Sequence, residues 1–155
     1  MKFSAPLIVV ENMKKSREFY EKVLHQKVIL DFGENITFDG DFSLQTNLSW
    51  QGFIDKSKTE ILQKSNNFEL YFEEENFDDF MSHLNSFDQI ELVHKVKEYP
   101  WGQRVIRFYD PDYHIIEVGE NMRTVVKRFL AEGLTVEETS KRSQFPIEFV
   151  ESCVE

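Results

Sequence analysis

The sequence is poor in cysteine, and Cys153 is its single example. One cysteine excludes an intramolecular disulfide and any metal site built from several thiolates. Because it lies so close to the end of the chain, we interpret it as incidental rather than catalytic.

Long apolar runs and excess positive charge are also missing. No run approaches the length of a membrane span, and the N-terminal residues have no apolar region of signal-peptide length. The 28 acidic residues outnumber the 18 basic ones, giving a formal net charge of -10. Such a surface repels phosphate backbones and anionic lipids. We therefore expect a cytoplasmic protein that binds neither nucleic acid nor membranes.

Aromatic and aliphatic residues are abundant by contrast. Hydrophobic residues make up 41% of the chain and aromatic residues 14%, with 15 phenylalanines among them. This composition can build a proper core, so disorder is not expected. A length of 155 residues suits one domain, or a two-part domain with a short appendage.

Hydrophobic periodicity predicts the same order of elements twice, a strand, a helix and three further strands. Asn12 and Asn76 are placed to cap the two helices. The first strand is apolar on both of its faces, which predicts cover on both sides, and Pro6 places it near a sheet edge. A polar connector with short helical turns, residues 48–67, separates the two series. The predicted strands and helices are residues 3–10, 16–24, 27–32, 35–38 and 41–46, then 67–73, 77–84, 90–98, 103–109 and 113–118.

The last predicted strand follows a turn that begins at Asp110, in which Pro111 presets the backbone and the flanking aspartates can accept hydrogen bonds from nearby backbone N–H groups. Residues 103–109 have the composition to pair with this strand as a hairpin. Glu117 lies on the face opposite His114 and is an acid within an apolar strand. A carboxylate there must pair, become protonated or bind a cation, because burying it alone is too costly.

Residues 121–155 predict three short helices. Gly133 ends the first, Thr135 and Glu138 form a capping box for the second, and Pro146 begins the third. The outline resembles a helix-turn-helix, but residues 146–153 contain two acids and no base, which disfavours DNA reading. We expect this tail to pack on the rest of the chain or against a second subunit.

Three segments together carry a resemblance to a known family: residues 7–24, residues 68–72 and residues 110–117. In this order and spacing the chain resembles the vicinal oxygen chelate superfamily, which includes glyoxalases, bleomycin-resistance proteins and dioxygenases. The resemblance implies an α+β fold in which paired βαβββ modules, residues 1–50 and 66–120, form a curved, partly closed mixed sheet. It assigns residues 1–120 to this domain and residues 121–155 to a helical C-terminal extension, and it implies a homodimer.

The resemblance also implies a divalent metal held by four positions, which fall at Ala5, Gln45, Glu69 and Glu117. Alanine has no donor, so the implied metal ligands are Gln45, Glu69 and Glu117, with the two glutamates also catalytic. An oxygen set favours Mg²⁺ or Mn²⁺, although Ni²⁺, Zn²⁺ or no metal at all stay open. The alternative for the glutamates is pairing with Arg104 or Arg107.

Substrate contacts are predicted for Trp50, Tyr71, Trp101 and Arg107. The aromatic side chains can form walls for a flat or apolar ligand. The two tryptophans have the alternative of packing under the connector and at the turn of residues 100–102. Arg107 is either a cationic anchor for an acidic substrate or the partner of Glu117.

Three functional hypotheses follow. The first is a glyoxalase-like lyase or isomerase that uses a divalent metal to assist proton abstraction from a small oxygen-bearing substrate. The second is a metal-free binding protein that, like the bleomycin-resistance branch, sequesters a small toxic molecule; an acidic surface suits cationic drugs. The third is a ligand-sensing regulator that uses the helical tail.

Overall fold

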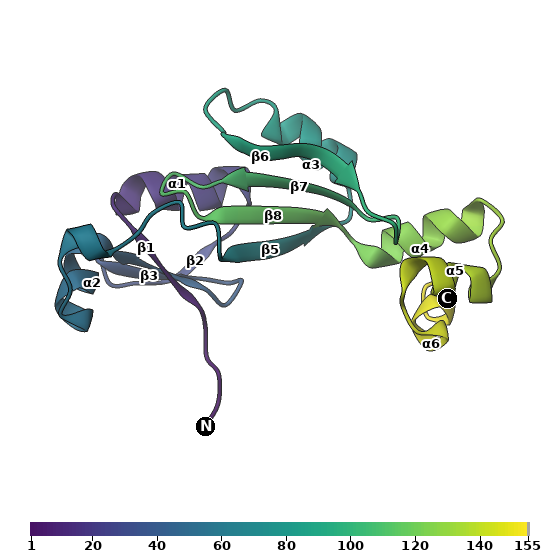
Figure 1. The fold of residues 1–155 in the computed structure, drawn as a ribbon, viewed down its shortest axis with the longest axis horizontal. Helices are drawn as coiled ribbons and strands as arrows, with labels where there is room; N and C mark the ends of the chain where they lie inside the picture. Colours follow the sequence, from purple (N-terminus) through teal and green to yellow (C-terminus); the bar gives the residue numbers. More distant parts are fainter. Residues whose placement is uncertain (155) are drawn as a thin grey trace. The chain divides into compact units, whose positions relative to one another are not determined.

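The computed structural model describes residues 1–154, so Glu155, the last residue of the predicted extension, lies outside the described residues. The predicted α+β fold of two βαβββ modules is confirmed (Figure 1). The first module contains β1 (Leu7–Val10), α1 (Met13–Val23), β2 (Val28–Asp31), β3 (Asn35–Phe38) and β4 (Ser43–Thr46). The second contains β5 (Glu69–Glu74), α3 (Phe77–Leu84), β6 (Leu92–Glu98), β7 (Arg104–Tyr109) and β8 (Ile115–Glu120).

The connector and the tail have the short helices that the sequence predicts. The connector contains α2 (Asn47–Ile54) and the 3₁₀ turn η1 (Lys58–Glu60). The tail contains α4 (Met122–Ala131), α5 (Val136–Ser143) and α6 (Ile147–Glu151). No helix within residues 1–154 combines the length and the apolar character that crossing a membrane would require.

The chain divides into two compact units. The first comprises residues 1–68 together with residues 109–114, and the second comprises residues 69–108 and 115–154. The turn that joins β7 to β8 therefore packs with the first unit, although it belongs to the second module in sequence.

The first unit is a four-stranded mixed sheet in the order β1-β4-β3-β2, with β1 parallel to β4. Helix α1 buries Tyr20 and Val23, and the Tyr20 ring packs on Phe38 and Phe42. Asn12 caps α1 as predicted, because its side chain accepts a hydrogen bond from the Lys15 N–H at 3.0 Å.

The first strand differs from the prediction in two respects. It begins at Leu7 rather than at residue 3. Just before the strand, the carbonyl of Pro6 accepts a hydrogen bond from the Ser43 N–H. Ile8 and Val10 are buried, but Leu7 is exposed and Val9 is half-buried. The prediction that both faces are covered is therefore wrong: one face packs in the core and the other does not. The predicted edge position is confirmed.

The second unit is a mixed sheet in the order β5-β8-β7-β6, with β5 parallel to β8. The predicted neighbouring of β7 and β8 is confirmed. Helix α3 buries Phe77, Phe80 and Leu84. Asn76 stands at the start of α3, but its side chain makes no capping bond; its N–H donates instead to the Glu74 carboxylate at 2.8 Å.

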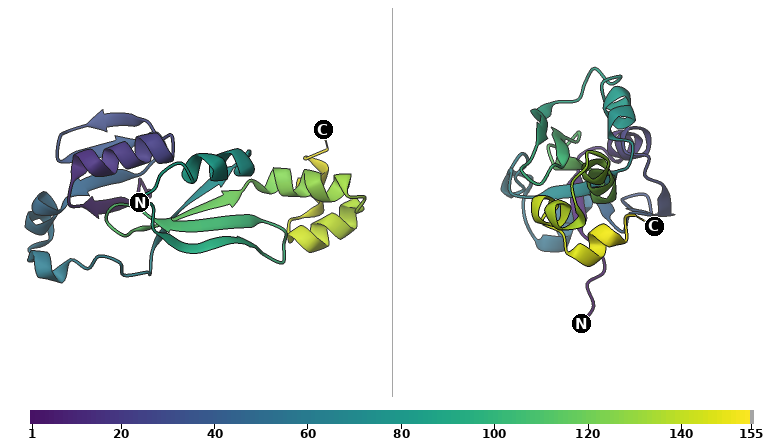
Figure 2. Two further views of the ribbon diagram at one scale, coloured as in Figure 1. Left: turned by 90° about the horizontal axis from the view of Figure 1, so that it is seen from above. Right: turned by 90° about the vertical axis from the view of Figure 1, so that its right-hand side faces the viewer.

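The tail helices pack within the second unit and follow the end of β8 (Figure 2). Phe129 of α4 lies against Gly102, and Trp101 packs on the cluster of Met122, Val125 and Phe129. The capping box of Thr135 and Glu138 is confirmed. Pro146 occupies the position just before α6. Cys153 is buried beside Val126 and Val150, which gives it a packing role.

Candidate functional site

Three adjacent strands of the second unit bring Glu69, Arg107 and Glu117 together. Glu69 is on β5, Glu117 on β8 and Arg107 on β7. The Nε atom of Arg107 donates to Oε2 of Glu69 at 2.9 Å, and its Nη2 atom forms an ion pair with Glu117. Glu117 is only 7% exposed. One guanidinium therefore neutralises part of the charge of two carboxylates.

The remaining nitrogen of Arg107 is also occupied. Its Nη1 atom donates to the Tyr99 hydroxyl at 2.8 Å and lies 3.4 Å from Nε2 of His94. Burial lowers the pKa of Arg107, but the hydrogen bonds to Glu69 and Tyr99 more than offset this, so the pKa is raised overall. The arginine is thus held as a cation with all three nitrogens engaged.

Arg104, the other predicted partner, belongs to a separate network. It binds Glu120 through Nη2 at 3.0 Å and Asp78 through Nη1 at 2.7 Å. The hydrogen bonds that it donates to Glu120 and then to Asp78 raise the pKa of Arg104. Of the two arginines that the sequence offers to Glu69 and Glu117, the structure pairs Arg107 with them.

The predicted metal ligands do not fit a divalent ion as they are arranged. Glu69 and Glu117 already share the cation of Arg107. Gln45 is buried in the first unit, where its Oε1 accepts from Asn35 at 2.9 Å and its amide donates to the carbonyl of Glu34 and to Ser49. Within residues 1–154, no three or more His, Cys, Asp or Glu side chains are grouped so as to hold a metal ion.

The aromatic residues predicted to contact a substrate have different surroundings in the structure. Tyr71 lies directly across from Glu117 in the β5–β8 register and is 48% exposed. Its hydroxyl donates to Glu73 at 3.0 Å and accepts from Gln103. Tyr71 is therefore available beside the Glu69–Arg107–Glu117 cluster.

Each of the two tryptophans lies within its own unit. Trp101 stacks on Tyr99 with ring centroids 4.6 Å apart. It also packs against the tail, a contact that the predicted alternative of packing at the turn of residues 100–102 did not include. Trp50 lies in α2 of the first unit and is half-buried.

Sequence reasoning did not identify Tyr99 and His94 as neighbours of this cluster. His94 pairs with Arg107 in the antiparallel β6–β7 register. Aligning residues 90–98 and 103–109 as a hairpin would have found it, since residues directly opposite share a face. Tyr99 lies just beyond β6 and gives no such signal.

A second cluster occupies the turn of residues 110–114 in the first unit. Asp110 accepts hydrogen bonds from the Tyr20 hydroxyl at 2.8 Å, from Nδ1 of His114 at 2.9 Å, and from the N–H groups of Asp112 and His114. Asp112 accepts from the Glu11 N–H and the Ser16 hydroxyl, each at 2.9 Å. The predicted bonding of these aspartates to backbone N–H groups is confirmed.

The comparisons with known proteins agree with this fold. The family model of the glyoxalase-like domain matches residues 3–123. A protein of unknown function from Agrobacterium tumefaciens is 35% identical, with 78% of this chain and 94% of that chain covered and a TM-score of 0.69. No curated protein matches.

Two more distant solved structures share the fold. One is a glyoxalase-related enzyme from Fulvimarina pelagi, at 16% identity, with 78% of this chain and 89% of that chain covered and a TM-score of 0.64. The other is a lactoylglutathione lyase from Agrobacterium tumefaciens, at 16% identity, with 76% and 92% covered and a TM-score of 0.57. With the family model, the paired βαβββ modules and the closing turn in agreement, this chain belongs to the glyoxalase-like domain family of the vicinal oxygen chelate superfamily.

Proposed function

We propose that this chain binds a small, flat cationic molecule without a metal ion, on the sheet face that carries Glu69, Arg107 and Glu117. The observation that supports this most strongly is the position of Arg107, which pairs with both acidic residues that a metal would need. Of the hypotheses open to the sequence, the metal-free binding protein that sequesters a toxic compound agrees best with this arrangement.

The charge of this face favours a cation. Glu69 and Glu117 carry two negative charges against the single positive charge of Arg107, and Glu73 adds another acid beside Tyr71. The half-exposed ring of Tyr71 offers a face for a cation–π contact. An acidic ligand is disfavoured, because every nitrogen of Arg107 already has a partner within the protein.

The metal-dependent lyase or isomerase needs a different arrangement. Proton abstraction at a metal would require Glu69 and Glu117 to bind the ion instead of Arg107. The partly buried guanidinium of Arg107 would then lose its carboxylate partners. This cost separates the two hypotheses, and a Mn²⁺ titration of the wild type and of Arg107→Met tests it.

The binding proposal is tested by fluorescence titration with proflavine, a planar cation, and with anilinonaphthalene sulfonate, an anion of similar size. We expect proflavine to bind at one site per chain and the anion to bind more weakly at that site. Glu69→Gln and Tyr71→Leu should each weaken proflavine binding about threefold to tenfold, because each removes one contact with the cation.

The matched control is Glu137→Gln, which removes one exposed acid from α5 in the tail and keeps the same change in net charge. It should leave proflavine binding unchanged. Equal loss in Glu69→Gln and Glu137→Gln, with no loss in Tyr71→Leu, would indicate attraction by net charge alone and would contradict a site at Tyr71.

A further inference from the structure

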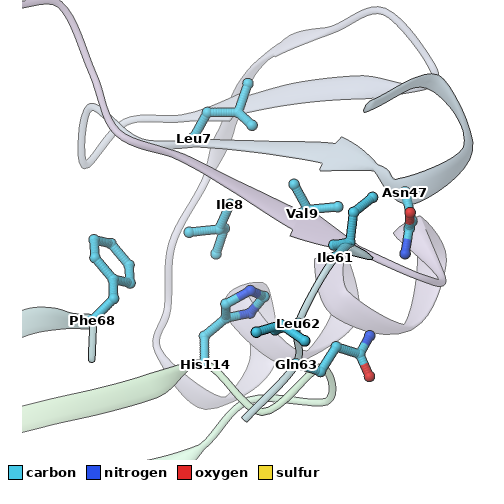
Figure 3. Close-up of a pocket in the computed structure, with 9 residues that line it drawn as sticks. All are labelled: Leu7, Ile8, Val9, Asn47, Ile61, Leu62, Gln63, Phe68 and His114. Carbon is cyan, nitrogen blue, oxygen red and sulfur yellow. The ribbon is translucent and has the colours of Figure 1, made fainter. Parts of the chain in front are cut away.

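The first unit contains a cavity of about 230 Å³ that is distinct from the Glu69–Arg107–Glu117 cluster (Figure 3). Its apolar lining comes from β1, from the connector and from the residue that precedes β5: Leu7, Ile8, Val9, Ile61, Leu62 and Phe68. Three of these side chains are substantially exposed, Leu7 at 40%, Phe68 at 45% and Leu62 at 78%. A ligand that covered them would gain hydrophobic free energy.

Three polar residues line this cavity, His114, Asn47 and Gln63, and Figure 3 shows the imidazole of His114 among the apolar side chains. Its Nδ1 atom is bonded to Oδ2 of Asp110 at 2.9 Å. This bond fixes the ring and leaves Nε2 as the nitrogen that a ligand can use. Asn47 also lines the cavity, but its side chain already donates to Glu11 and accepts from Gln51.

The charges around His114 decide which ligand head group suits it. Burial lowers the pKa of His114, but the hydrogen bond between Nδ1 and Asp110 and the charges of Asp110 and Asp112 raise it overall. Because Nδ1 already donates to Asp110, an N–H on Nε2 belongs to the doubly protonated ring, and these two carboxylates stabilise that form. The carboxylates of Asp110 and Asp112 act on the ring, so their negative charges would repel an anionic ligand. A neutral oxygen can accept the hydrogen bond without that penalty.

The volume sets the size of the ligand. A cavity of about 150 Å³ lined by apolar side chains holds benzene. At about 230 Å³, this cavity has room for a benzene-sized ring with a two-carbon or three-carbon substituent.

We propose that this cavity is a binding site for a small neutral aromatic carbonyl compound, whose oxygen accepts a hydrogen bond from Nε2 of His114. The apolar walls supply the binding energy and the imidazole selects for the oxygen. The site lies in the first unit and is independent of the face proposed to bind cations.

The proposal is tested by titrating the full chain with three matched ligands, acetophenone, ethylbenzene and benzoate, using ligand-observed NMR. Acetophenone should bind most tightly. Ethylbenzene should bind about tenfold more weakly, because it leaves the N–H of His114 buried without an acceptor. Benzoate should bind more weakly than acetophenone, because of Asp110 and Asp112.

Two variants and two controls test whether acetophenone binds in this cavity. His114→Gln should remove the preference for acetophenone over ethylbenzene, because one amide cannot both satisfy Asp110 and project into the cavity as the ring does. Val9→Phe should fill the space and remove binding of both neutral ligands. His83→Gln, the same change in α3, and Glu137→Gln in α5 should leave acetophenone binding unchanged.

Three results would overturn the proposal: equal binding of acetophenone and ethylbenzene, tighter binding of benzoate, or acetophenone binding that survives Val9→Phe. Loss of acetophenone binding in either control variant would also overturn the proposal, because both residues lie in the second unit. Failure of proflavine to bind would count against the proposed function alone.

Discussion

Arg107 on β7 forms an ion pair with Glu117 on the neighbouring strand β8, where the carboxylate is almost completely buried. The requirement that an acid in an apolar strand must find a partner is thus met by a cation that the chain itself supplies. The same guanidinium reaches Glu69. The stability of the second sheet and the chemistry of its polar face therefore depend on one side chain.

Replacing Arg107 should destabilise the protein more than replacing both partners. Arg107→Met leaves Glu117 buried without its cation and should cost about 3 kcal/mol of unfolding free energy. The double variant Arg107→Met/Glu117→Leu should recover most of this loss, because an apolar pair of similar volume replaces the ions. Urea denaturation of the single and double variants measures both values.

The control for this comparison is Arg17→Met. Arg17 pairs with Glu21 at 3.0 Å and with Asp31 at 2.8 Å, but all three side chains are well exposed. It should cost less than about 1 kcal/mol. A similar cost for Arg17 and Arg107, or a double variant less stable than Arg107→Met, would show that the buried pair has no special role.

Gly102 should be essential for docking of the tail. Its φ of +85° disfavours any other residue, and a Cβ there would lie 2.1 Å from the Phe129 ring. Gly102→Ala should therefore cost about 2–3 kcal/mol, from backbone strain and overpacking together. Thermal or urea unfolding provides the measurement.

Gly52 is the matched control for this substitution. It lies within α2, and a Cβ added there meets nothing within 4 Å. Gly52→Ala should stabilise the chain by about 0.5–1 kcal/mol, because alanine favours the helix. Equal effects at the two positions would contradict the docking of Phe129 on Gly102.

The contribution of His114 to stability should fall as pH rises above the ordinary histidine pKa of 6.5. Asp110, Asp112 and the Tyr20 hydroxyl all lie around it, and the pKa of His114 in the folded chain is raised above its ordinary value of 6.5. A raised folded pKa means that the stabilisation is complete below the unfolded value and is lost as pH rises through the folded value.

The measurement is the free energy of unfolding of the wild type and of His114→Gln over a range of about pH 6 to pH 9. The difference between the two proteins should be largest at the acid end and should shrink toward the alkaline end. A difference that grows with pH would mean that the imidazole is held neutral.

The sequence predicted those features that depend on local patterns. Hydrophobic periodicity identified the repeated βαβββ order, and Asn12 and the Thr135 capping box were found because their partners lie three residues away. The turn at Asp110 was predicted for the same reason. Asn76 shows the limit of such patterns, since its side chain makes no capping bond despite a favourable position.

Contacts between distant parts of the chain were harder to predict. The Tyr20 hydroxyl reaches Asp110 across 90 positions, and no local pattern connects them. Pairing of Glu117 with Arg107 was one of two open alternatives, because alternation along a strand gives the face of a residue but not its neighbour on the next strand. The pairing of His114 with Asp110 depends on the turn geometry and was missed.

We propose that Arg107 takes the place of a metal ion between Glu69 and Glu117, and a Mn²⁺ titration followed by electron paramagnetic resonance can decide this. We predict that the metal-stripped wild type binds no Mn²⁺ at this position, whereas Arg107→Met gains one weak site that Glu117→Gln removes again. Binding of one Mn²⁺ per chain by the wild type, lost in both Glu69→Gln and Glu117→Gln, would contradict the account.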